Sequence, residues 1–177
     1  MTQAPNVYMV GMMGAGKTTV GRMLARKLRL RFVDSDHEVE ERCGVKVPVI
    51  FDLEGEEGFR AREAQVITEL TASRGILLAT GGGVVLNEQN RERLAQSGTV
   101  IYLRARPEDL YRRVRGDRNR PLLATPDPLG RLRELYAQRD PLYQAIAHIT
   151  VDTGSQGIAV LARTLLGKLE ERWKRCA

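Results

Sequence analysis

Residues 11–18 carry the clearest chemistry in this sequence. Their letters, GMMGAGKT, match the pattern G-x-x-x-x-G-K-[ST], a glycine-rich loop that wraps its backbone N–H groups around phosphate oxygens. Lys17 is suited to the outer phosphates of a nucleoside triphosphate, and the Thr18 hydroxyl is suited to Mg²⁺. A short apolar run precedes the loop and helically spaced apolar residues follow it. This strand–loop–helix context predicts a nucleoside triphosphate site.

Two acidic residues, Asp34 and Asp36, end a second strand predicted over 31–36. In an extended backbone, side chains two residues apart point to the same side. One carboxylate could help to hold Mg²⁺, directly or through water, and the other could accept a proton from an attacking hydroxyl. Solvated acidic residues at a strand end are the alternative, but a neighbouring phosphate loop favours the functional interpretation.

Three consecutive glycines, residues 81–83, follow the continuous apolar run 76–79. Glycines remove every side chain from this stretch, so a ligand can approach the backbone closely. A flexible turn is the alternative, but such a turn rarely needs three glycines in a row. We therefore expect a ligand contact here.

Arg60 and Arg62 lie at the start of a predicted helix, where the helix dipole disfavours cations. Salt bridges to nearby glutamates would explain them, and so would a substrate carboxylate. From these residues alone both interpretations stay open.

The elements that position these residues alternate along the chain. Strands are predicted over 7–10, 31–36, 76–79, 99–103 and 148–151, and helices over 19–30, 38–42, 47–51, 59–72, 87–96, 107–115, 129–138, 141–147 and from 156 onward, with a turn at 55–58. This alternation predicts a three-layer α/β sandwich with a five-stranded parallel sheet. Right-handed crossovers place all strand carboxyl ends at one edge, so the three glycine and acidic segments should share one crevice.

Length and composition narrow the class of protein. A chain of 177 residues suits one domain. The net charge is +6, and arginines are concentrated between positions 104 and 139. Nucleic acid, an anionic substrate or solvated helix faces could each explain them. Because aromatic residues are few, we expect solvated faces for most arginines, an anion site for a few, and no nucleic-acid partner.

Targeting signals are not evident in the sequence. Residues 1–6 contain no long apolar stretch, so no signal peptide is expected, and no apolar run is long enough to span a membrane. Cys43 and Cys176 have no metal-type spacing, which is typical of a reduced, cytoplasmic protein.

Taken in order, these segments resemble the shikimate kinases, members of the nucleoside-monophosphate-kinase-like P-loop family. The matching stretches are residues 11–19, 32–36, 50–51, 54–60, 79–83, 120–123 and 141–143, together with Glu63 and Arg139. The resemblance implies a single P-loop kinase domain over 1–177, with a mobile lid over about 116–128 and a shikimate-binding region over about 34–63. It also implies transfer of the ATP γ-phosphoryl group to the shikimate 3-hydroxyl, with Mg²⁺ as cofactor, by an enzyme expected to be monomeric.

The resemblance also implies a role for each matched residue. Catalytic roles fall to Lys17, Asp36 and Arg120, the last on the lid. ATP contacts are expected from Gly14, Ala15, Gly16, Lys17, Thr18, Thr19, Arg120 and Gln156, and shikimate contacts from Asp36, Arg60, Gly82 and Arg139. Mg²⁺ would be held by Thr18 and Asp34. The alternatives are a gluconate or nucleotide kinase of the same fold, and a nucleotide-switched regulator or nucleic-acid-binding module.

Overall fold

Five parallel strands form the centre of the computed structural model, which describes residues 5–154 and 156–176. Of the segment 1–6, for which no signal peptide is expected, residues 1–4 lie outside the described part. The strands are β1 (Asn6–Val10), β2 (Arg31–Asp34), β3 (Ile76–Ala79), β4 (Gly98–Arg104) and β5 (Ile149–Asp152). They lie in the order β2-β3-β1-β4-β5 with every pairing parallel, which confirms the predicted sheet.

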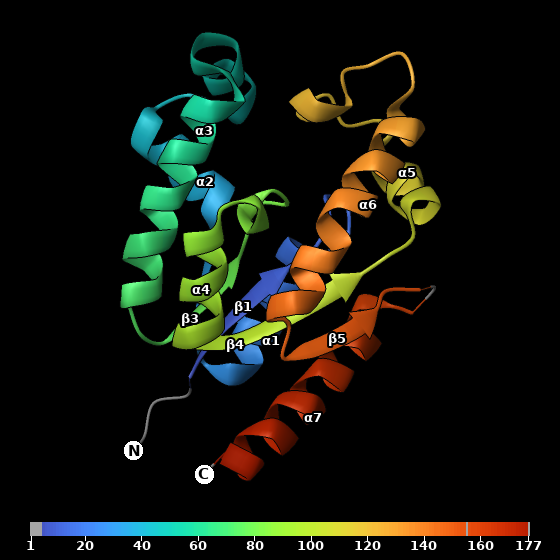
Figure 1. Ribbon diagram of the computed structural model, residues 1–177. Helices are drawn as coiled ribbons and strands as arrows, with labels where there is room; N and C mark the ends of the chain where they lie inside the picture. The colour runs from blue at the N-terminus through green and yellow to red at the C-terminus, as the bar shows by residue number, and fades with distance from the viewer. Residues whose placement is uncertain (1–4, 155, 177) are drawn as a thin grey trace.

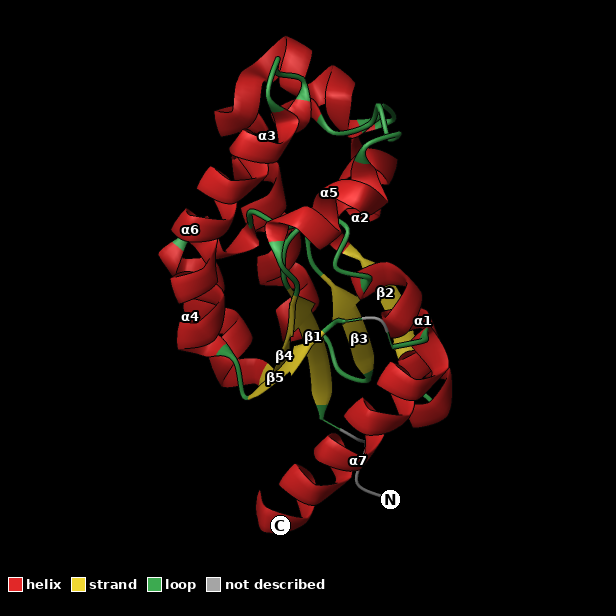
Figure 2. Ribbon diagram, turned by 90° about the vertical axis from the view of Figure 1, so that its right-hand side faces the viewer, coloured by secondary structure: helices red, strands yellow, loops and turns green. Residues whose placement is uncertain are grey.

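Helices cover both faces of this sheet. Helices α1 (Lys17–Leu28) and α7 (Ile158–Cys176) pack together on one face, while α4 (Glu88–Ser97) and α6 (Pro128–Ile146) pack on the other. Figure 2 shows the sheet between these two layers. Every residue of β1 and β3 is buried, as expected for strands with apolar side chains on both faces. Burial of each such side chain stabilises the fold by about 1.5–3 kcal/mol.

The second strand ends earlier than predicted. β2 stops at Asp34, and Ser35 begins helix α2 (Ser35–Cys43). The Asp34 carboxylate caps this helix, since its Oδ1 accepts hydrogen bonds from the backbone N–H groups of Asp36 at 3.0 Å and His37 at 3.3 Å. The prediction that Asp34 and Asp36 both lie in an extended strand was therefore wrong. Asp34 is at the end of the strand, and Asp36 is in the first turn of the following helix.

Helix α3 (Val47–Ala72) is two helical segments joined at Gly55. Gly55 has φ 69° and ψ −178°, a conformation that glycine adopts without a Cβ penalty. The two predicted helices are confirmed, including Pro48 in the first turn, but the turn predicted over 55–58 is a single-residue break. The second segment starts early because Glu56 and Glu57 then fall at its amino terminus, where the dipole favours anions.

Helix α6 was predicted as two helices separated near Pro141, and this was wrong. The structure carries one helix through Pro141, with Leu132, Leu135, Arg139, Tyr143 and Ile146 buried along it. Proline removes one backbone hydrogen bond, at a cost of about 3 kcal/mol in a helix interior. Packing of this buried stripe is sufficient to keep the helix continuous.

Helix α5 (Pro107–Val114) begins at Pro107 as predicted, and Asn87 caps α4 by accepting from the N–H of Asn90 at 3.2 Å. The lid segment predicted over about 116–128 runs from the end of α5 to the first residue of α6, and it contains the short 3-10 turn η2 (Pro121–Leu123). Figure 1 shows this segment facing α3 across the carboxyl edge of the sheet. A second short turn, η1 (Val84–Leu86), follows the triple glycine. Across the described residues, no helix is both long and apolar enough to cross a bilayer.

Candidate active site

The phosphate loop joins β1 to α1 and depends on glycine conformations. Gly11, Gly14 and Gly16 have φ values of 146°, 79° and 100°. At Gly14 a Cβ atom would also lie 2.7 Å from the Val114 side chain. Gly16 directly precedes the first turn of α1, so the free N–H groups of that helix face the loop. This geometry forms the anion cradle that the motif predicts.

Lys17 is buried against the loop. Its Nζ donates hydrogen bonds to the backbone oxygens of Gly11 at 2.7 Å and Met12 at 2.9 Å. Burial lowers the pKa of Lys17 to about 8, although the negative charge of Asp36 opposes this shift. The ammonium group is therefore held beside the cradle and lacks its full hydration shell.

Thr18 and Asp34 form a pair of oxygen donors beside the loop. The Thr18 hydroxyl donates to Asp34 Oδ2 at 2.8 Å, while Oδ1 of the same carboxylate caps α2. Mg²⁺ prefers oxygen ligands and usually combines one or two protein groups with water and substrate phosphates. The pair fits that pattern. Within the described parts of the chain, no cluster of three or more His, Cys, Asp or Glu residues could hold a metal by itself.

Asp36 and Glu63 bring two buried carboxyl groups to the triple glycine. Asp36 Oδ1 and Glu63 Oε1 are buried without a hydrogen-bond partner among the described residues. A Cβ atom at Gly81 would lie 2.5 Å from the first oxygen and 2.6 Å from the second. Burial and the nearby Glu63 raise the pKa of Asp36 to about 7. Asp36 is thus suited to accept a proton near neutral pH.

Arg60 and Arg62 have different surroundings. Arg60 Nη1 lies 2.8 Å from Glu63 Oε2, and its guanidinium packs against Gly83, where a Cβ would clash with it. Arg62 instead pairs at 2.6 Å with Glu54 on the exposed side of α3. The structure therefore separates the two arginines that sequence alone could not, since it places only Arg60 at the triple glycine.

Arg139 is a buried guanidinium on α6 with 1% of its surface exposed. Its Nε has no hydrogen-bond partner, and no ion pair to Arg139 occurs among residues 5–154 and 156–176. Burial lowers the pKa of Arg139, because desolvation disfavours the charged form. Its Nη1 lies 3.4 Å from where a Gly82 Cβ would stand. An unpaired buried cation beside a glycine backbone is suited to an anionic ligand.

Arg120 lies in the lid segment above these groups. Its Nε donates to Asp117 Oδ2 at 2.9 Å, and both side chains are about one-third exposed. The lid arginine is thus held by a residue of its own segment, at a surface where it can exchange partners.

Two pockets meet at this edge of the sheet. The first follows the phosphate loop, and the sequence-predicted residues lining it are Gly14, Gly16, Lys17, Thr18, Thr19, Asp34, Asp36, Gly82 and Arg120. The second has about 470 Å³ of space not filled by atoms and is lined by Asp36, Arg60, Gly82, Arg120 and Arg139, with an apolar wall that includes Val47, Phe51 and Phe59. Asp36, Gly82 and Arg120 border both pockets. The Asp36 carboxyl group and the Arg120 guanidinium therefore lie where a ligand in one pocket would contact a ligand in the other.

Two predicted ATP contacts are not among the side chains that line the phosphate pocket. Ala15 is buried, so its contribution would come from the loop backbone. Gln156 is exposed beyond β5 and lines neither pocket. Its contact with the nucleotide stays a prediction.

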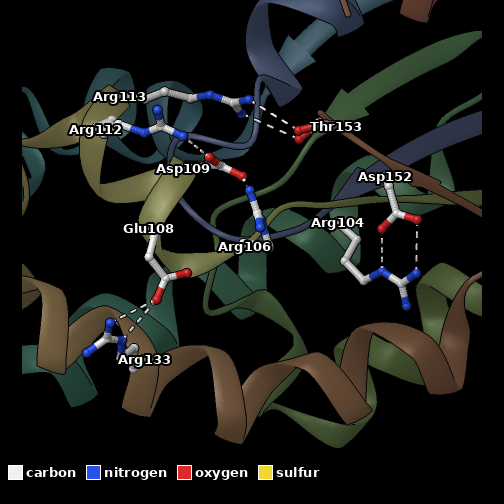
Figure 3. Close-up of polar contacts among 9 residues, drawn as sticks. All are labelled: Arg104, Arg106, Glu108, Asp109, Arg112, Arg113, Arg133, Asp152 and Thr153. Carbon is white, nitrogen blue, oxygen red and sulfur yellow. Dashed lines mark hydrogen bonds and ion pairs between the residues drawn. The ribbon is translucent and has the colours of Figure 1, made fainter. Parts of the chain in front are cut away.

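Sequence reasoning gave no role to two residues at the site. Glu63 matched the family resemblance without a role; it is 1% exposed on α3, and its position among the buried apolar residues Phe59 and Val66 was the available signal. Arg113 donates to the Thr153 carbonyl oxygen at 3.3 Å (Figure 3). It also donates to the Gly14 carbonyl oxygen at 3.1 Å, which links the loop to the residue after β5. Nothing in its local sequence distinguished Arg113 from its neighbours.

Most arginines between positions 104 and 139 have acidic partners at the surface. Arg104 pairs with Asp152 at 2.6 Å, Arg133 with Glu108 at 2.9 Å, and Arg106 with Asp109 at 3.1 Å. Figure 3 draws these pairs. Such exposed pairs each contribute roughly 0–1 kcal/mol. They support the interpretation of solvated helix faces.

The fold and the two joined pockets define a class of protein, a P-loop kinase that acts on a small anionic alcohol. A family model described as shikimate kinase matches residues 13–170. The chain belongs to the shikimate kinase family, whose members are ATP-dependent kinases with an alcohol acceptor.

Individual relatives agree with this assignment. The shikimate kinase of Thiobacillus denitrificans is 60% identical over 96% of this chain and 93% of its own length. That of Ralstonia nicotianae is 61% identical over 93% of this chain and 87% of its own. The solved structure of the Acinetobacter baumannii shikimate kinase in complex with shikimate matches with a TM-score of 0.94 and 47% identity, covering 96% of this chain and 94% of that one. These matches favour an enzyme over a regulator or nucleic-acid-binding module.

Proposed function

We propose that this chain transfers the γ-phosphoryl group of ATP to the 3-hydroxyl of shikimate, giving shikimate 3-phosphate and ADP, a step that leads toward chorismate and the aromatic amino acids. The observation that carries the proposal is the junction of the two pockets at Asp36, Gly82 and Arg120. Membership of the shikimate kinase family supports it.

Arg139 and Arg60 would bind the carboxylate of shikimate. A guanidinium presents paired donors in the geometry that a carboxylate accepts. Arg139 has no anionic partner of its own among the described residues, and Arg60 retains free donor capacity beside Gly83 while it pairs with Glu63. Asp36 and the Gly82 backbone would then contact the hydroxyl-bearing ring.

Residues 14–19, which include Lys17 and extend one residue beyond the phosphate loop, would bind ATP together with the lid arginine Arg120. Phosphoryl transfer depends mainly on positioning and on neutralising charge in the transition state. Thr18 and Asp34 would hold Mg²⁺, which neutralises phosphate charge when bound. Movement of the lid segment would exchange the Asp117 partner of Arg120 for the phosphates and exclude water.

Asp36 would accept the proton of the attacking hydroxyl. Its free Oδ1 faces the triple glycine at the border of both pockets. Because the pKa of Asp36 is raised to about 7, its carboxylate binds a proton more readily near neutral pH than an ordinary aspartate does.

We further propose that residues 1–177 act as one kinase domain, with the lid over about 116–128 and the shikimate region over about 34–63, and that the enzyme is a cytoplasmic monomer without a nucleic-acid or membrane partner. The surface ion pairs of the arginines reduce the positive charge available to nucleic acid.

A substrate panel tests the proposed function. ADP formation is measured with ATP and, in turn, shikimate, gluconate and several nucleoside monophosphates. Turnover with shikimate is expected to exceed that with every other acceptor by orders of magnitude. Preferred phosphorylation of gluconate or of a nucleotide would replace this function with another of the same fold. ATP binding without turnover, together with salt-sensitive binding to nucleic acid, would revive the regulator.

Metal removal gives a second expected result. Chelation by EDTA should abolish turnover, and added Mg²⁺ should restore it. Thr18→Val removes the hydroxyl paired with Asp34, so the Mg²⁺ concentration for half-maximal activity should rise about tenfold or more. Titration of activity against Mg²⁺ measures this change.

The matched variant is Thr18→Ser, which keeps a hydroxyl at the same position and should restore the Mg²⁺ requirement to near the original. If Thr18→Val and the unaltered protein respond identically to Mg²⁺, Thr18 is not a metal ligand.

A further inference from the structure

Tyr143 lies beneath the substrate pocket without lining it. It is one helical turn beyond Arg139 on α6 and is completely buried. Its hydroxyl donates to the backbone carbonyl oxygen of Gly82, and the Sδ atom of Met12 in the phosphate loop lies 3.7 Å from the same hydroxyl. This single group therefore contacts the segments on which both pockets depend.

The triple glycine needs such a contact, because glycines leave the backbone free to rotate. The peptide group is planar, so a hydrogen bond to the Gly82 carbonyl also fixes the direction of the next N–H group. On the pocket side, Gly82 faces Arg139 Nη1, which lies 3.4 Å from the position of its absent Cβ. Tyr143 is buried and lines neither pocket, so it holds this peptide from within the protein core.

The Tyr143 ring is itself fixed in place. It packs against the ring of Tyr102 on β4, with centroids 4.9 Å apart, and the Tyr102 hydroxyl donates to Asp140 on α6 at 2.6 Å. Burial raises the pKa of the Tyr143 hydroxyl, so this group stays a proton donor throughout the neutral range. Gly82 in the segment after β3 is therefore tied to Arg139 and Tyr143 of α6 through contacts that β4 supports.

We propose that Tyr143 is a positioning residue for the acceptor substrate: its hydroxyl fixes the Gly82 peptide in register with the Arg139 guanidinium. The two groups together fix the carboxylated ring relative to the phosphate loop. This inference rests on the proposed function, since it assigns Gly82 and Arg139 to the acceptor.

Tyr143→Phe removes the hydroxyl alone and tests the inference. The Gly82 carbonyl then loses its partner in a buried position, so the KM for shikimate should rise about tenfold. The kcat should stay within about threefold and the KM for ATP within about twofold, because Lys17 and the loop glycines are unchanged. Steady-state kinetics with each substrate varied in turn gives this KM-against-kcat split.

Tyr102→Phe is the matched control. It removes the neighbouring hydroxyl of the same ring pair, whose bond to Asp140 holds α6 to β4 without touching Gly82. It should lower the thermal midpoint while leaving the KM for shikimate within about twofold. Thermal melts and circular dichroism of both variants establish that each is folded.

Three outcomes are distinguishable. A raised KM for shikimate in Tyr143→Phe alone supports the inference. Equal kinetics in both variants, with only a lowered thermal midpoint, reduces Tyr143 to a packing role and overturns it. If the unaltered protein and Tyr102→Phe both fail to phosphorylate shikimate, the proposed function fails and the inference fails with it.

Discussion

Replacement of Arg139 by methionine should raise the KM for shikimate on the order of 100-fold or more while ATP affinity survives. Truncating one partner of a buried charge pair costs about 2–5 kcal/mol, because the other charge is then buried without compensation. In the complex that other charge would be the substrate carboxylate. Steady-state kinetics and calorimetric titration with shikimate and with ADP measure the two affinities separately.

Stability should respond in the opposite sense from an ordinary core mutation. Arg139 is almost fully buried, its Nε has no partner in the described part of the chain, and methionine keeps an unbranched apolar stem without the charge. Removal of an uncompensated buried charge relieves a desolvation cost, so the ligand-free variant should melt no lower than the unaltered protein. Arg60→Met should differ, because it leaves the buried Glu63 carboxylate without its 2.8 Å partner and should lower the thermal midpoint.

Arg104→Met is the matched control, since it removes an arginine from an exposed pair with Asp152. Neither substrate affinity should change by more than about twofold. Equal loss of affinity for ATP and shikimate in Arg139→Met would exclude a specific carboxylate contact.

Asp36→Asn should reduce kcat on the order of 100-fold to 10,000-fold and yet stabilise the ligand-free protein. The loss of rate follows from removing the proton acceptor. The gain in stability follows from the pKa of Asp36, which is raised from an ordinary 3.8 to about 7. This shift means that ionisation of the buried carboxyl group is less favourable in the folded state than in the unfolded state. At pH 8 the ionised carboxylate destabilises the folded state by a few kcal/mol. A neutral asparagine at this position does not carry that cost.

The pH dependence has a definite sign. The folded state binds the Asp36 proton more tightly than the unfolded state, so stability falls as pH rises from about 4 to about 7. The advantage of Asp36→Asn should therefore be largest at pH 8, smaller at pH 5 and absent below about pH 4. Thermal melts of both proteins at pH 8 and pH 5 measure this trend.

Asp140→Asn serves as the comparison. Asp140 accepts hydrogen bonds from Tyr102 at 2.6 Å and Gln144 at 2.7 Å, so its carboxylate is compensated and the change should not stabilise the protein. If Asp36→Asn melts below the unaltered protein at pH 8, or if its thermal midpoint rises equally at pH 5 and pH 8, ionised Asp36 does not destabilise the folded state.

Sequence patterns alone predicted the phosphate loop, the parallel sheet and most of the element starts. These features depend on local rules: glycine conformations at Gly14 and Gly16, continuous apolar strands, and caps such as Asn87. Where the sequence argument was wrong, a longer-range or competing interaction decided. Packing of the buried residues of α6 keeps that helix continuous through Pro141. The Asp34 carboxylate caps α2, so Asp36 lies in the first turn of a helix instead of in the strand.

The residues that line the second pocket are brought together by packing between distant parts of the chain. Arg60 and Arg62 are alike in sequence, but the break at Gly55 and the packing of α3 set one against Gly83 and the other against Glu54 in solvent. Arg139 lies far along the chain from Gly82, and the packing of α6 against β4 and against η1, the turn after the triple glycine, brings them together. Local propensities depend on a few neighbouring residues. Whether a charge is buried and lacks a partner depends on side chains that come from distant parts of the chain. The sequence thus determined the phosphate loop, and the fold determined which charges face it.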